Sequence, residues 1–492
     1  MLKISASKIP DEVRSVSDTI ESAGFETYLV GGCVRDLLLG RPPKDWDFTT
    51  NAKPEDIQGL FEDTFYENEF GTVGIVNKET PEESVQVIEV TPYRLESTYS
   101  NARHPDKVEF SDSLEDDLKR RDFTINAIAY SIKNGEITDP HKGGEDIKRK
   151  SIVAVGDAEE RFFEDALRML RAVRLSAELT FTIDPDTAEA ITKHVDGLSK
   201  ISKERIRDEI IRTIMTSSPI EAFFLMQKLG MLPFVAPDLE RGIGIEQNQA
   251  HKFDVFEHLL RTMQHGADKG WSFDIRIAGL YHDISKPETR RWSEEKKDWT
   301  FHGHEVVGAR VAKKAFEDLK LPKKQIDKLV KLVRWHMFFS DPDQVTLSAV
   351  RRMIRNVGEE NIWDLLNLRI CDRIGSGRPK EQPFRFRKYK SMVEEALRDP
   401  IAVGMLKITG NRIMEITKEK PGKRIGWVLH ALLEEVLDDP KLNNEEYLEK
   451  RSVELFKLPE NELLALGKKG KERQKTEEES AVEELRKKYW VS

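Results

Sequence analysis

The segment from Tyr28 to Thr50, YLVGGCVRDLLLGRPPKDWDFTT, constrains the fold of this chain more than any other stretch. It predicts a short apolar strand that runs into Gly31-Gly32, followed by a compact helix that ends near Gly40. Asp45 and Asp47 come next. Because residues two apart in a strand face the same side, we expect these two carboxylates to project together.

A glycine turn followed by paired carboxylates suits the binding of a nucleoside triphosphate with magnesium. Glycine lets backbone N–H groups approach phosphate oxygens, and carboxylates hold the metal ions that neutralise the phosphate charge. A DxD sequence alone is more often a solvated acidic loop. Joined to Gly31-Gly32 and Arg35, the pair favours a magnesium-dependent phosphoryl-transfer site.

Length and composition narrow the class of protein. A chain of 492 residues is too long for one ordinary core and predicts about three or four domains. A charged fraction of 34% and a mean hydropathy of -0.55 are typical of a soluble protein. No apolar run approaches the roughly 18 residues of a membrane span, and the first residues lack the apolar centre of a signal peptide. Cys33 and Cys371 offer neither a disulfide framework nor a zinc pattern, so we expect a cytoplasmic protein with no membrane partner.

The net charge of -9 gives no global sign of a nucleic-acid partner, so an RNA-binding surface would have to be local. Acidic residues are interleaved with every basic cluster, and solvated helix faces therefore remain the alternative. The candidate clusters are Lys119-Arg120-Arg121, Lys148-Arg149-Lys150 and Lys203/Arg205/Arg207.

Strand signals are concentrated in the first 150 residues and fade almost entirely after Lys150. Ser84–Thr91 predicts a strand. One face of this strand would carry Val85, Val87, Glu89 and Thr91. A carboxylate on such an otherwise apolar face is costly unless a partner or a metal compensates it.

A β-hairpin is predicted next, and helices after it. The hairpin would pair 127–132 with 136–139 through a tight primed turn at Asn134-Gly135. After Lys150 the spacing of apolar residues is helical. The predicted helices are Arg161–Glu178, Thr187–His194, Lys203–Thr216 and Ile220–Leu229.

The segment Glu164-Asp165-Ala166-Leu167-Arg168 lies in the first of these helices. Asp165 and Arg168 are three residues apart and would share a helix face, where the plain interpretation is a salt bridge worth a few tenths of a kcal/mol. The functional interpretation is base reading. A carboxylate accepts from an exocyclic amine, while a guanidinium donates to the adjacent ring nitrogen. Cytosine and adenine both present that edge, whereas uracil and guanine do not, so the pair would admit CTP and ATP.

Several motifs occur in the order found in the class II tRNA nucleotidyltransferases, the CCA-adding enzymes of the polymerase-β superfamily. They are GGxVRD with DxD, RRDFTINA, the DP-x-x-GG hinge, EDALRMLRA and SKERI, and the chain resembles that family over about residues 20–215. The resemblance implies an α+β fold, with a small nucleotidyltransferase head followed by a helical neck, an HD-type body and a helical tail. We expect these parts at 1–150, 151–245, 246–380 and 381–492.

The resemblance also implies roles for individual residues. Asp45 and Asp47 would bind two magnesium ions, and Glu89 would be the third superfamily carboxylate. The implied nucleotide-binding residues are Gly31, Gly32, Arg35, Arg121, Asp122, Asp165, Arg168, Arg171 and Arg174. The primer 3′-hydroxyl would attack the α-phosphorus in line and release pyrophosphate. The implied partners are the tRNA acceptor end, CTP and ATP, for a monomer or a homodimer.

Related activities remain open. CC-adding enzymes generally lack a flexible loop between the DxD and RRDFT motifs, and the stretch Arg94–Phe110 argues against that activity here. A-adding enzymes and bacterial poly(A) polymerases keep nearly the same head motifs. The histidine-rich unit after residue 246 is unlike the usual poly(A) polymerase body and favours CCA addition.

That unit resembles the HD phosphohydrolase superfamily. His258, His282-Asp283 and Asp372 follow its H…HD…D order, and His304 and His336 lie where two-metal members place further ligands. Such ligands suit a divalent transition metal that activates water for phosphoester hydrolysis. Ser285 replaces the glycine of the common HDIGK, which leaves an inert HD fold as an alternative. An active unit would trim 2′,3′-cyclic or terminal phosphates from tRNA ends.

The last part of the chain carries weaker signals. Arg378–Arg387 looks like a linker, and the stretch from Gly467 onward predicts an exposed helix or partial disorder. Two alternatives for the whole protein also remain, an HD phosphohydrolase whose head only binds nucleotide and a non-catalytic tRNA-binding protein.

Overall fold

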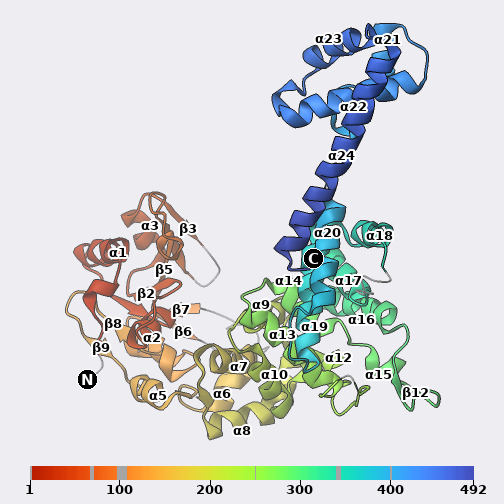
Figure 1. Cartoon of the computed structure of the whole chain (residues 1–492). Helices are drawn as coiled ribbons and strands as arrows, with labels where there is room; N and C mark the ends of the chain where they lie inside the picture. The colour runs from red at the N-terminus through yellow and green to blue at the C-terminus, as the bar shows by residue number, and fades with distance from the viewer. Residues whose placement is uncertain are drawn as a thin grey trace. The chain divides into compact units, whose positions relative to one another are not determined.

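The computed structural model describes residues 3–66, 71–96, 108–249, 251–338, 345–398 and 402–491. The chain forms two compact units. Figure 1 shows its helices and strands coloured from the N-terminus to the C-terminus. Unit 1 is Met1–His336 with Asn367–Pro379, and unit 2 is Met337–Leu366 with Lys380–Ser492. The central part of the predicted loop, 97–107, lies outside the described residues. Among the helices in the described ranges, none is both long and apolar enough to cross a membrane.

The head of unit 1 is built on a seven-stranded sheet in the order β3-β4-β5-β2-β1-β8-β9. The pair β2 and β5 is parallel, and the other neighbours are antiparallel. The strands are β1 Thr27–Val30, β2 Trp46–Thr50, β3 Thr64–Tyr66, β4 Val73–Val76, β5 Val87–Pro92, β8 Ala129–Tyr130 and β9 Ile137–Thr138. A separate ribbon joins β6 Arg94–Glu96 to β7 Val108–Phe110.

Short helices accompany the sheet and complete the predicted α+β class. The helix after the glycine turn, α2, covers Gly32–Leu38 and buries Val34 and Leu37. The others in the head are α1 Asp11–Ser22, α3 Pro54–Leu60, α4 Leu114–Lys119 and α5 Gly143–Arg149, with 3-10 turns at Ala6–Lys8, Glu83–Val85 and Thr124–Asn126.

The strand predicted over Ser84–Thr91 starts later than expected. Gln86 has helical φ and ψ angles of -62° and -32°, so Val85 ends a 3-10 helix and the strand begins at Val87. The fully buried side chains of β5 are Ile88 and Val90. Glu89 therefore lies on the half-buried face, and the prediction of an apolar face around it was wrong.

The predicted hairpin forms, but its turn is longer. Tyr130 pairs with Ile137, which leaves residues 131–136 as the loop. Ser131 N donates to Glu136 O at 3.0 Å, and Gly135 takes a positive φ of 73°. The two-residue turn predicted at Asn134-Gly135 was wrong, because the Ser131–Glu136 hydrogen bond leaves four residues, 132–135, between the two arms.

The neck continues unit 1 as short helices. The predictions over 187–194, 203–216 and 220–229 are confirmed within a few residues. The neck helices are α6 Ala158–Glu164, α7 Leu167–Leu179, α8 Pro185–His194, α9 Lys203–Ile214, α10 Pro219–Lys228, α11 Leu232–Val235 and α12 Pro237–Glu240, with a 3-10 turn at Val195–Lys200. Strands β10 Ser151–Ile152 and β11 Thr182–Ile183 pair in parallel.

The continuous helix predicted over Arg161–Glu178 is split. Asp165 is extended, with φ -145° and ψ 101°, between the end of α6 and the start of α7. Its side chain accepts a hydrogen bond from Leu167 N at 3.1 Å. An aspartate that caps a following helix competes with helical continuation, which explains the break.

The last part of unit 1 is the histidine-rich helical region. Its elements are α13 Val255–Asp268, α14 Phe273–Tyr281, α15 Lys286–Thr289, β12 Arg291–Ser293, β13 Asp298–Thr300, α16 His304–Asp318 and α17 Lys323–Trp335. Helix α19, Ile362–Gly375, begins in unit 2 and ends in unit 1.

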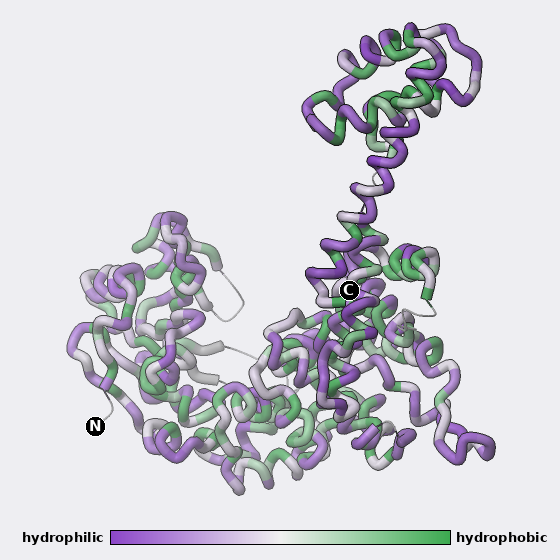
Figure 2. The backbone as a smooth tube through the Cα atoms, in the orientation of Figure 1, coloured by the Kyte–Doolittle hydropathy of each residue, from purple (hydrophilic) through white to green (hydrophobic). Residues whose placement is uncertain are grey.

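Unit 2 is all helical in its described part. Its helices are α18 Leu347–Val357, α20 Phe384–Leu397, α21 Gly410–Thr417, α22 Lys423–Asp438, α23 Glu445–Phe456 and α24 Glu460–Lys488, with 3-10 turns at Glu359–Asn361, Val403–Met405 and Pro440–Leu442. Because α20 begins at Phe384, the connection after α19 is shorter than the predicted linker. The stretch after Gly467 is helical, and Figure 2 shows it coloured mostly hydrophilic.

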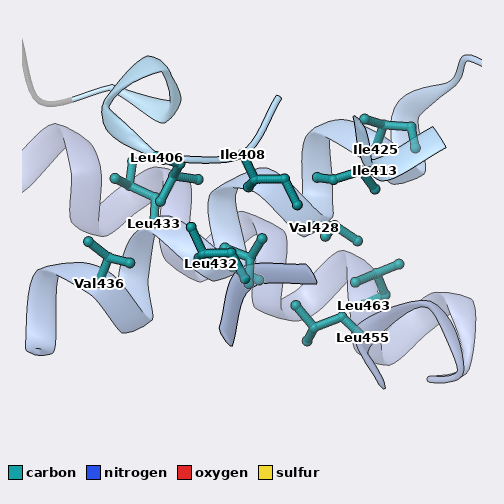
Figure 3. Packing of buried hydrophobic residues seen from close by; sticks show 12 residues of the cluster. Leu406, Ile408, Ile413, Ile425, Val428, Leu432, Leu433, Val436, Leu455 and Leu463 are labelled. Atoms are coloured by element: carbon teal, nitrogen blue, oxygen red, sulfur yellow. The ribbon is translucent and has the colours of Figure 1, made fainter. Parts of the chain in front are cut away.

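A compact apolar core holds α21 to α24 together (Figure 3). Val428 and Leu432 of α22 are fully buried with Leu463 of α24. The two helices approach closely through Gly467 and Gly470. A Cβ on Gly470 would lie only 2.1 Å from the His430 carbonyl oxygen, so the crossing requires glycine there.

Candidate functional site

The glycine turn predicted from the sequence lies beside several of the predicted site residues of the head. Strand β1 ends at Val30, and Gly31 then adopts φ 76° and ψ -137°, a conformation that L side chains rarely take. A Cβ on Gly31 would lie 3.4 Å from Arg121 Nη1 and 3.5 Å from Asp47 Oδ2. The turn, a guanidinium and a carboxylate are therefore immediate neighbours.

The second glycine brings in the other predicted aspartate. A Cβ on Gly32 would lie 3.6 Å from Arg35 Nη2 and 4.0 Å from Asp45 Oδ1. Asp45 is exposed in a bend immediately before β2, and Asp47 is half-buried within the strand. The two carboxylates thus flank the same glycine pair, although only Asp47 belongs to the strand.

Glu89 joins them through the sheet. It is the register partner of Asp47 in the parallel pair of β2 and β5. Neighbouring strands lie about 4.8 Å apart, and register partners point to the same face. We call Asp45, Asp47 and Glu89 the carboxylate set. Its field reaches the buried Cys33 thiol, whose pKa rises to about 12 through burial and through the charges of Asp47 and Asp45.

A chain of polar contacts runs from Arg35 to the neck. Arg35 Nη1 donates to Asn126 Oδ1 at 3.0 Å, and Asn126 Nδ2 donates to Asp122 Oδ1 at 3.2 Å. Asp122 Oδ2 then lies 2.8 Å from Arg171 Nη2. Burial raises the pKa of Asp122, but the Arg171 charge and the Asn126 hydrogen bond outweigh it and hold the pKa below its usual value. Three predicted residues are thus joined through Asn126, which sequence reasoning missed although it stands in RRDFTINA.

Arg121 is held in place by another residue that the sequence did not single out. Asp117 of α4 is fully buried and pairs with Arg121 Nη2 at 2.9 Å and with Arg120 Nη2 at 2.5 Å. The spacing of three and four residues within DDLKRR was the available signal. Much of the predicted basic cluster at 119–121 is therefore committed to an internal ion pair.

The two residues predicted to read the base have separate partners in this structure. Asp165 Oδ2 accepts from Arg205 Nη2 at 2.6 Å. Arg168 Nη1 donates to Glu164 Oε2 at 2.7 Å, and its Nη2 donates to the Arg120 carbonyl oxygen at 3.1 Å. Because Asp165 is extended, the shared helix face assumed for the pair does not exist. Its role as a base reader stays a prediction.

Arg174 is drawn away from this network. It is buried and pairs with Glu209 of α9 at 2.7 Å and with Glu178 at 2.9 Å. These contacts brace α7 against α9. A nucleotide contact of Arg174 remains a prediction from the motif.

The histidine-rich region brings all six predicted ligands to one place. Asp283 is the centre, since Nε2 of both His258 and His282 lies 3.1 Å from its Oδ2. On its other oxygen, Oδ1, lie His304 Nε2 at 3.0 Å and His336 Nε2 at 3.3 Å. We call these five residues with Asp372 the histidine cluster.

Asp372 completes one half of the cluster. Its Oδ1 lies 3.5 Å from His258 Nε2 and 3.6 Å from His282 Nε2. Two groups of donor atoms each lie within 4.8 Å, and Asp283 belongs to both: one joins it to His251, His258 and Asp372, the other to His282 and His336. A carboxylate shared by two groups of imidazoles is the arrangement that bridges a pair of divalent cations.

The histidine rings are oriented for metal binding. Nδ1 of His282, His304 and His336 lies 2.8, 2.6 and 2.7 Å from the carbonyl oxygens of Gly279, Phe301 and Val333. An Nδ1–H that donates to a carbonyl leaves the Nε2 lone pair free for a metal ion.

Electrostatics within the cluster favour a cation. Burial lowers the pKa of His258 and lowers that of His336 to about 4, so both rings are neutral near pH 7. Burial also opposes protonation of His282, but the charges of Asp283 and Asp372 raise its pKa to about 9. The cluster therefore carries two carboxylate charges and binds a proton at a position where a divalent ion also fits.

The serine at the HDIGK glycine position does not disturb the loop. Ser285 has φ -99° and ψ 8°, which needs no glycine. Its Oγ donates to the His304 carbonyl oxygen at 2.7 Å and ties the HD segment to the start of α16.

Two neighbours of the cluster were not predicted as site residues. Lys286 is buried, and its Nζ lies 2.5 Å from Asp283 Oδ2 and 2.6 Å from Gln247 Oε1. His251 can join one group of donors, and burial lowers its pKa to about 3. The sequence signal for Lys286 was its place in HDISK.

Three regions of the chain match known protein families. Residues 27–153 match the Poly A polymerase head domain, and residues 180–243 match the probable RNA and SrmB-binding site of polymerase A. Residues 255–374 match the HD domain.

Relatives in sequence are CCA-adding enzymes. That of Levilactobacillus brevis is 39% identical over 291 residues, which cover 58% of this chain and 69% of the relative. That of Lactobacillus delbrueckii subsp. bulgaricus is 44% identical over 224 residues, which cover 45% of this chain and 55% of the relative. The chain thus spans about half to two thirds of the length of these relatives.

Similar folds occur among solved structures. The Bacillus stearothermophilus CCA-adding enzyme in complex with CTP aligns with a TM-score of 0.57 and 27% identity, over 91% of this chain and 98% of that one. A CCA-adding enzyme in apo form II shares the fold, with a TM-score of 0.53 and 19% identity over 90% and 96% of the two chains.

Proposed function

This chain belongs to the CCA-adding enzyme family, as its ordered motifs predicted, and we propose that it adds CCA to tRNA 3′ ends from CTP and ATP without a nucleic-acid template. The observation that carries the proposal is the carboxylate set beside the Gly31-Gly32 turn, with Arg121 in contact range of the same turn.

In the proposed reaction each residue has a definite task. The backbone of Gly31-Gly32 and the guanidiniums of Arg35 and Arg121 hold the triphosphate of the incoming nucleotide. The primer 3′-hydroxyl oxygen forms a bond to the α-phosphorus and loses its proton to solvent, the bond from that phosphorus to the bridging oxygen breaks, and pyrophosphate leaves. The carboxylate set offers oxygen ligands for Mg²⁺, which when bound neutralises charge on the phosphates.

Base choice is the second element of the proposal. Asp165 would accept a hydrogen bond from the exocyclic amine of cytosine or adenine, and Arg168 would donate one to the adjacent ring nitrogen. Both side chains are already hydrogen-bonded, so nucleotide binding would exchange Arg205 for a base amine at Asp165 and release Arg168 from Glu164. The cost of breaking existing pairs would raise the penalty for a base that cannot replace them.

Sequencing the 3′ ends made on one tRNA that lacks its terminal nucleotides tests this function. The tRNA is incubated with each nucleoside triphosphate separately and with all four together. Ordered CCA ends, with UTP and GTP rejected, support the proposal. A single adenosine on a CC-ended tRNA only, or a long adenosine tail, would instead identify an A-adding enzyme or a poly(A) polymerase.

A second activity is proposed for the histidine cluster, hydrolysis of 2′,3′-cyclic or terminal phosphates on RNA. The bridging position of Asp283 between two groups of imidazoles favours it. When bound, a pair of divalent transition-metal ions would lower the pKa of water and neutralise the phosphoester. Water then adds to phosphorus, the bond to the ribose oxygen breaks, and that oxygen takes up a proton.

The two activities are separable by mutation. Asp45→Ala is expected to abolish nucleotide addition and leave hydrolysis, whereas His282→Ala is expected to do the reverse. Hydrolysis without nucleotide addition in the wild type would identify a phosphohydrolase whose head only binds nucleotide. Unchanged behaviour of both variants would indicate a non-catalytic tRNA-binding protein.

A further inference from the structure

A small two-stranded ribbon lies next to the histidine cluster in the chain and carries two tryptophans. Strands β12 and β13 pair with Trp292 opposite Trp299, and Figure 1 shows the ribbon projecting beside α15 and α16. The indole rings make an edge-on contact, with centroids 5.2 Å apart and planes at 76°. Trp292 is 47% exposed.

Arg290 extends this arrangement into a layered surface. Its guanidinium carbon lies 3.5 Å from the centre of the Trp299 ring. Arg290 also approaches Glu246, but at 3.7 Å, while Arg291 beside it is exposed. We call Arg290, Trp292 and Trp299 the tryptophan platform. It presents an open aromatic ring together with the positive charge of Arg290, which stacks on the partner ring.

The platform is tied directly to the metal-binding residues. Arg290 follows Lys286 by four residues, and Lys286 Nζ contacts Asp283. On the other strand, Asp298 Oδ2 accepts from Gln249 N at 3.2 Å, two residues before His251. Trp299 precedes His304 by five residues, which places their Cα atoms no more than about 18 Å apart. With about 5 Å between register partners, Trp292 lies within about 23 Å of His304.

Ribbon stability alone does not explain the exposed tryptophan. A cross-strand aromatic pair adds about 0.2 to 1 kcal/mol to a ribbon, and the half-buried Trp299 would gain a similar amount opposite a β-branched residue. Single-stranded RNA is recognised by stacking unpaired bases on aromatic rings and on arginine planes, with cationic groups along the backbone. The platform offers both kinds of surface beside a site suited to phosphoesters.

We propose that the tryptophan platform binds a nucleobase of a single-stranded RNA 3′ end whose terminal phosphate lies at the histidine cluster. This inference rests on the phosphohydrolase function proposed above and adds its substrate class, an RNA strand rather than a mononucleotide. A stacked strand rises about 3.4 Å per nucleotide, so the docked base belongs to one of about the last seven nucleotides.

Chain-length dependence of hydrolysis tests the platform. The substrates are oligouridylates of one, two, four and eight nucleotides that end in a 2′,3′-cyclic phosphate, with Mn²⁺ or Ni²⁺ supplied to the full-length protein. For the wild type KM should fall with length once the strand reaches the platform. Trp292→Val, which keeps a β-branched residue in the strand, should raise KM for the longest substrate by about 5- to 100-fold and remove the length dependence. Trp292→Tyr keeps an aromatic ring and should keep most of the length dependence.

Two controls separate stacking from other effects. Bis(p-nitrophenyl) phosphate carries no nucleobase, so its hydrolysis should be equal in the wild type and in Trp292→Val. Trp490→Ala removes another exposed tryptophan, from unit 2, and should leave every KM unchanged. Equal length dependence in the wild type and Trp292→Val would overturn the proposal.

A binding readout keeps the test independent of hydrolysis. Single 5-iodouridines placed along an eight-nucleotide strand are irradiated with the protein, and the crosslinked residue is mapped by mass spectrometry. A crosslink at Trp292 supports the platform even where no metal yields hydrolysis, an outcome that would refute only the phosphohydrolase. Crosslinks confined to the head, with none at Trp292, would refute the platform.

Discussion

Asp47 of β2 and Glu89 of β5 are register partners in the parallel pair of the head sheet, so their carboxylates point to the same face, and Asp47 also lies beside the glycine turn. Like charges at that spacing repel each other, and a nearby cation relieves the repulsion. Arg121, which contacts the same turn as Asp47, supplies part of that compensation. Divalent ions would supply more.

Neutralising either member of this pair should stop nucleotide addition. Asp47→Asn and Glu89→Gln keep side-chain volume but lose the charge that holds a cation, so we expect addition to fall at least about 100-fold. The rate of CMP incorporation into a truncated tRNA measures it. Glu55→Gln, an exposed carboxamide exchange on α3, is the matched control and should change nothing. Normal nucleotide addition by Glu89→Gln would show that the Glu89 carboxylate is not needed to hold the cation.

Local sequence patterns predicted which residues form the head site, but they did not predict which of these residues contact one another. The adjacent glycines predicted the turn, and the DxD spacing predicted two carboxylates beside it, although Asp45 lies in a bend outside β2 and not in the strand. Asn126 escaped prediction because its importance comes from joining Arg35 to Asp122, residues 91 and four positions away. Only the folded chain reveals such a bridge.

The split between α6 and α7 shows where helical periodicity misleads. The apolar stripe continues through Asp165, so spacing alone predicts one helix. The Asp165 side chain instead accepts a hydrogen bond from Leu167 N at the start of α7. This bond competes with continuation of the helix, and the spacing of apolar residues carries no information about it. In the histidine cluster the order of ligands was predictable, and Lys286 had a signal in its place three residues after Asp283. His251 instead reaches the cluster through the packing of a loop, for which the sequence has no fixed spacing.

Removing the buried Asp117 should weaken both stability and nucleotide binding. Asp117→Asn leaves Arg120 and Arg121 without their shared anion, and breaking a buried pair of this kind costs about 3 to 5 kcal/mol. We expect a lower Tm by calorimetry and a higher KM for CTP, because Arg121 is no longer held at the glycine turn. Glu115→Gln on the exposed side of α4 is the control. A lower Tm with an unchanged KM would confine Asp117 to a structural role.

The same residue should give stability a defined pH dependence. Burial raises the pKa of Asp117, but the charges of Arg121 and Arg120 outweigh it and lower the pKa below the ordinary value. A carboxyl with a depressed folded-state pKa stabilises the fold above its unfolded pKa of about 3.9, and this contribution is lost as pH falls through the folded-state value. Denaturant unfolding between pH 6 and 3 should therefore show a smaller loss of stability for Asp117→Asn than for the wild type. Parallel curves would contradict the assignment.

Metal stoichiometry should report the bridging position of Asp283. In a chain that also carries Asp47→Asn, which weakens cation binding in the head, we expect two Mn²⁺ ions per chain, about one after His336→Gln, and weak binding of both after Asp283→Asn, since both donor groups share that carboxylate. Equilibrium dialysis followed by elemental analysis measures the count without relying on activity. His302→Gln changes an exposed neighbouring histidine and should keep the full count. Retention of one tightly bound ion by Asp283→Asn would show that the two groups act separately.

The glycine crossing in unit 2 should be sensitive to a single methyl group. Gly470→Ala places a Cβ 2.1 Å from the His430 carbonyl oxygen, so α22 and α24 must separate and the core around Val428 and Leu463 must loosen. Overpacking of this kind costs about 1 to 3 kcal/mol, more than the roughly 1 kcal/mol that alanine gains over glycine in a helix. Gly426→Ala is the matched control, because a Cβ there meets nothing within 4 Å and should stabilise α22. Opposite shifts in the unfolding midpoint of the two variants are therefore expected, and a stabilised Gly470→Ala would show that the helices do not cross at this distance.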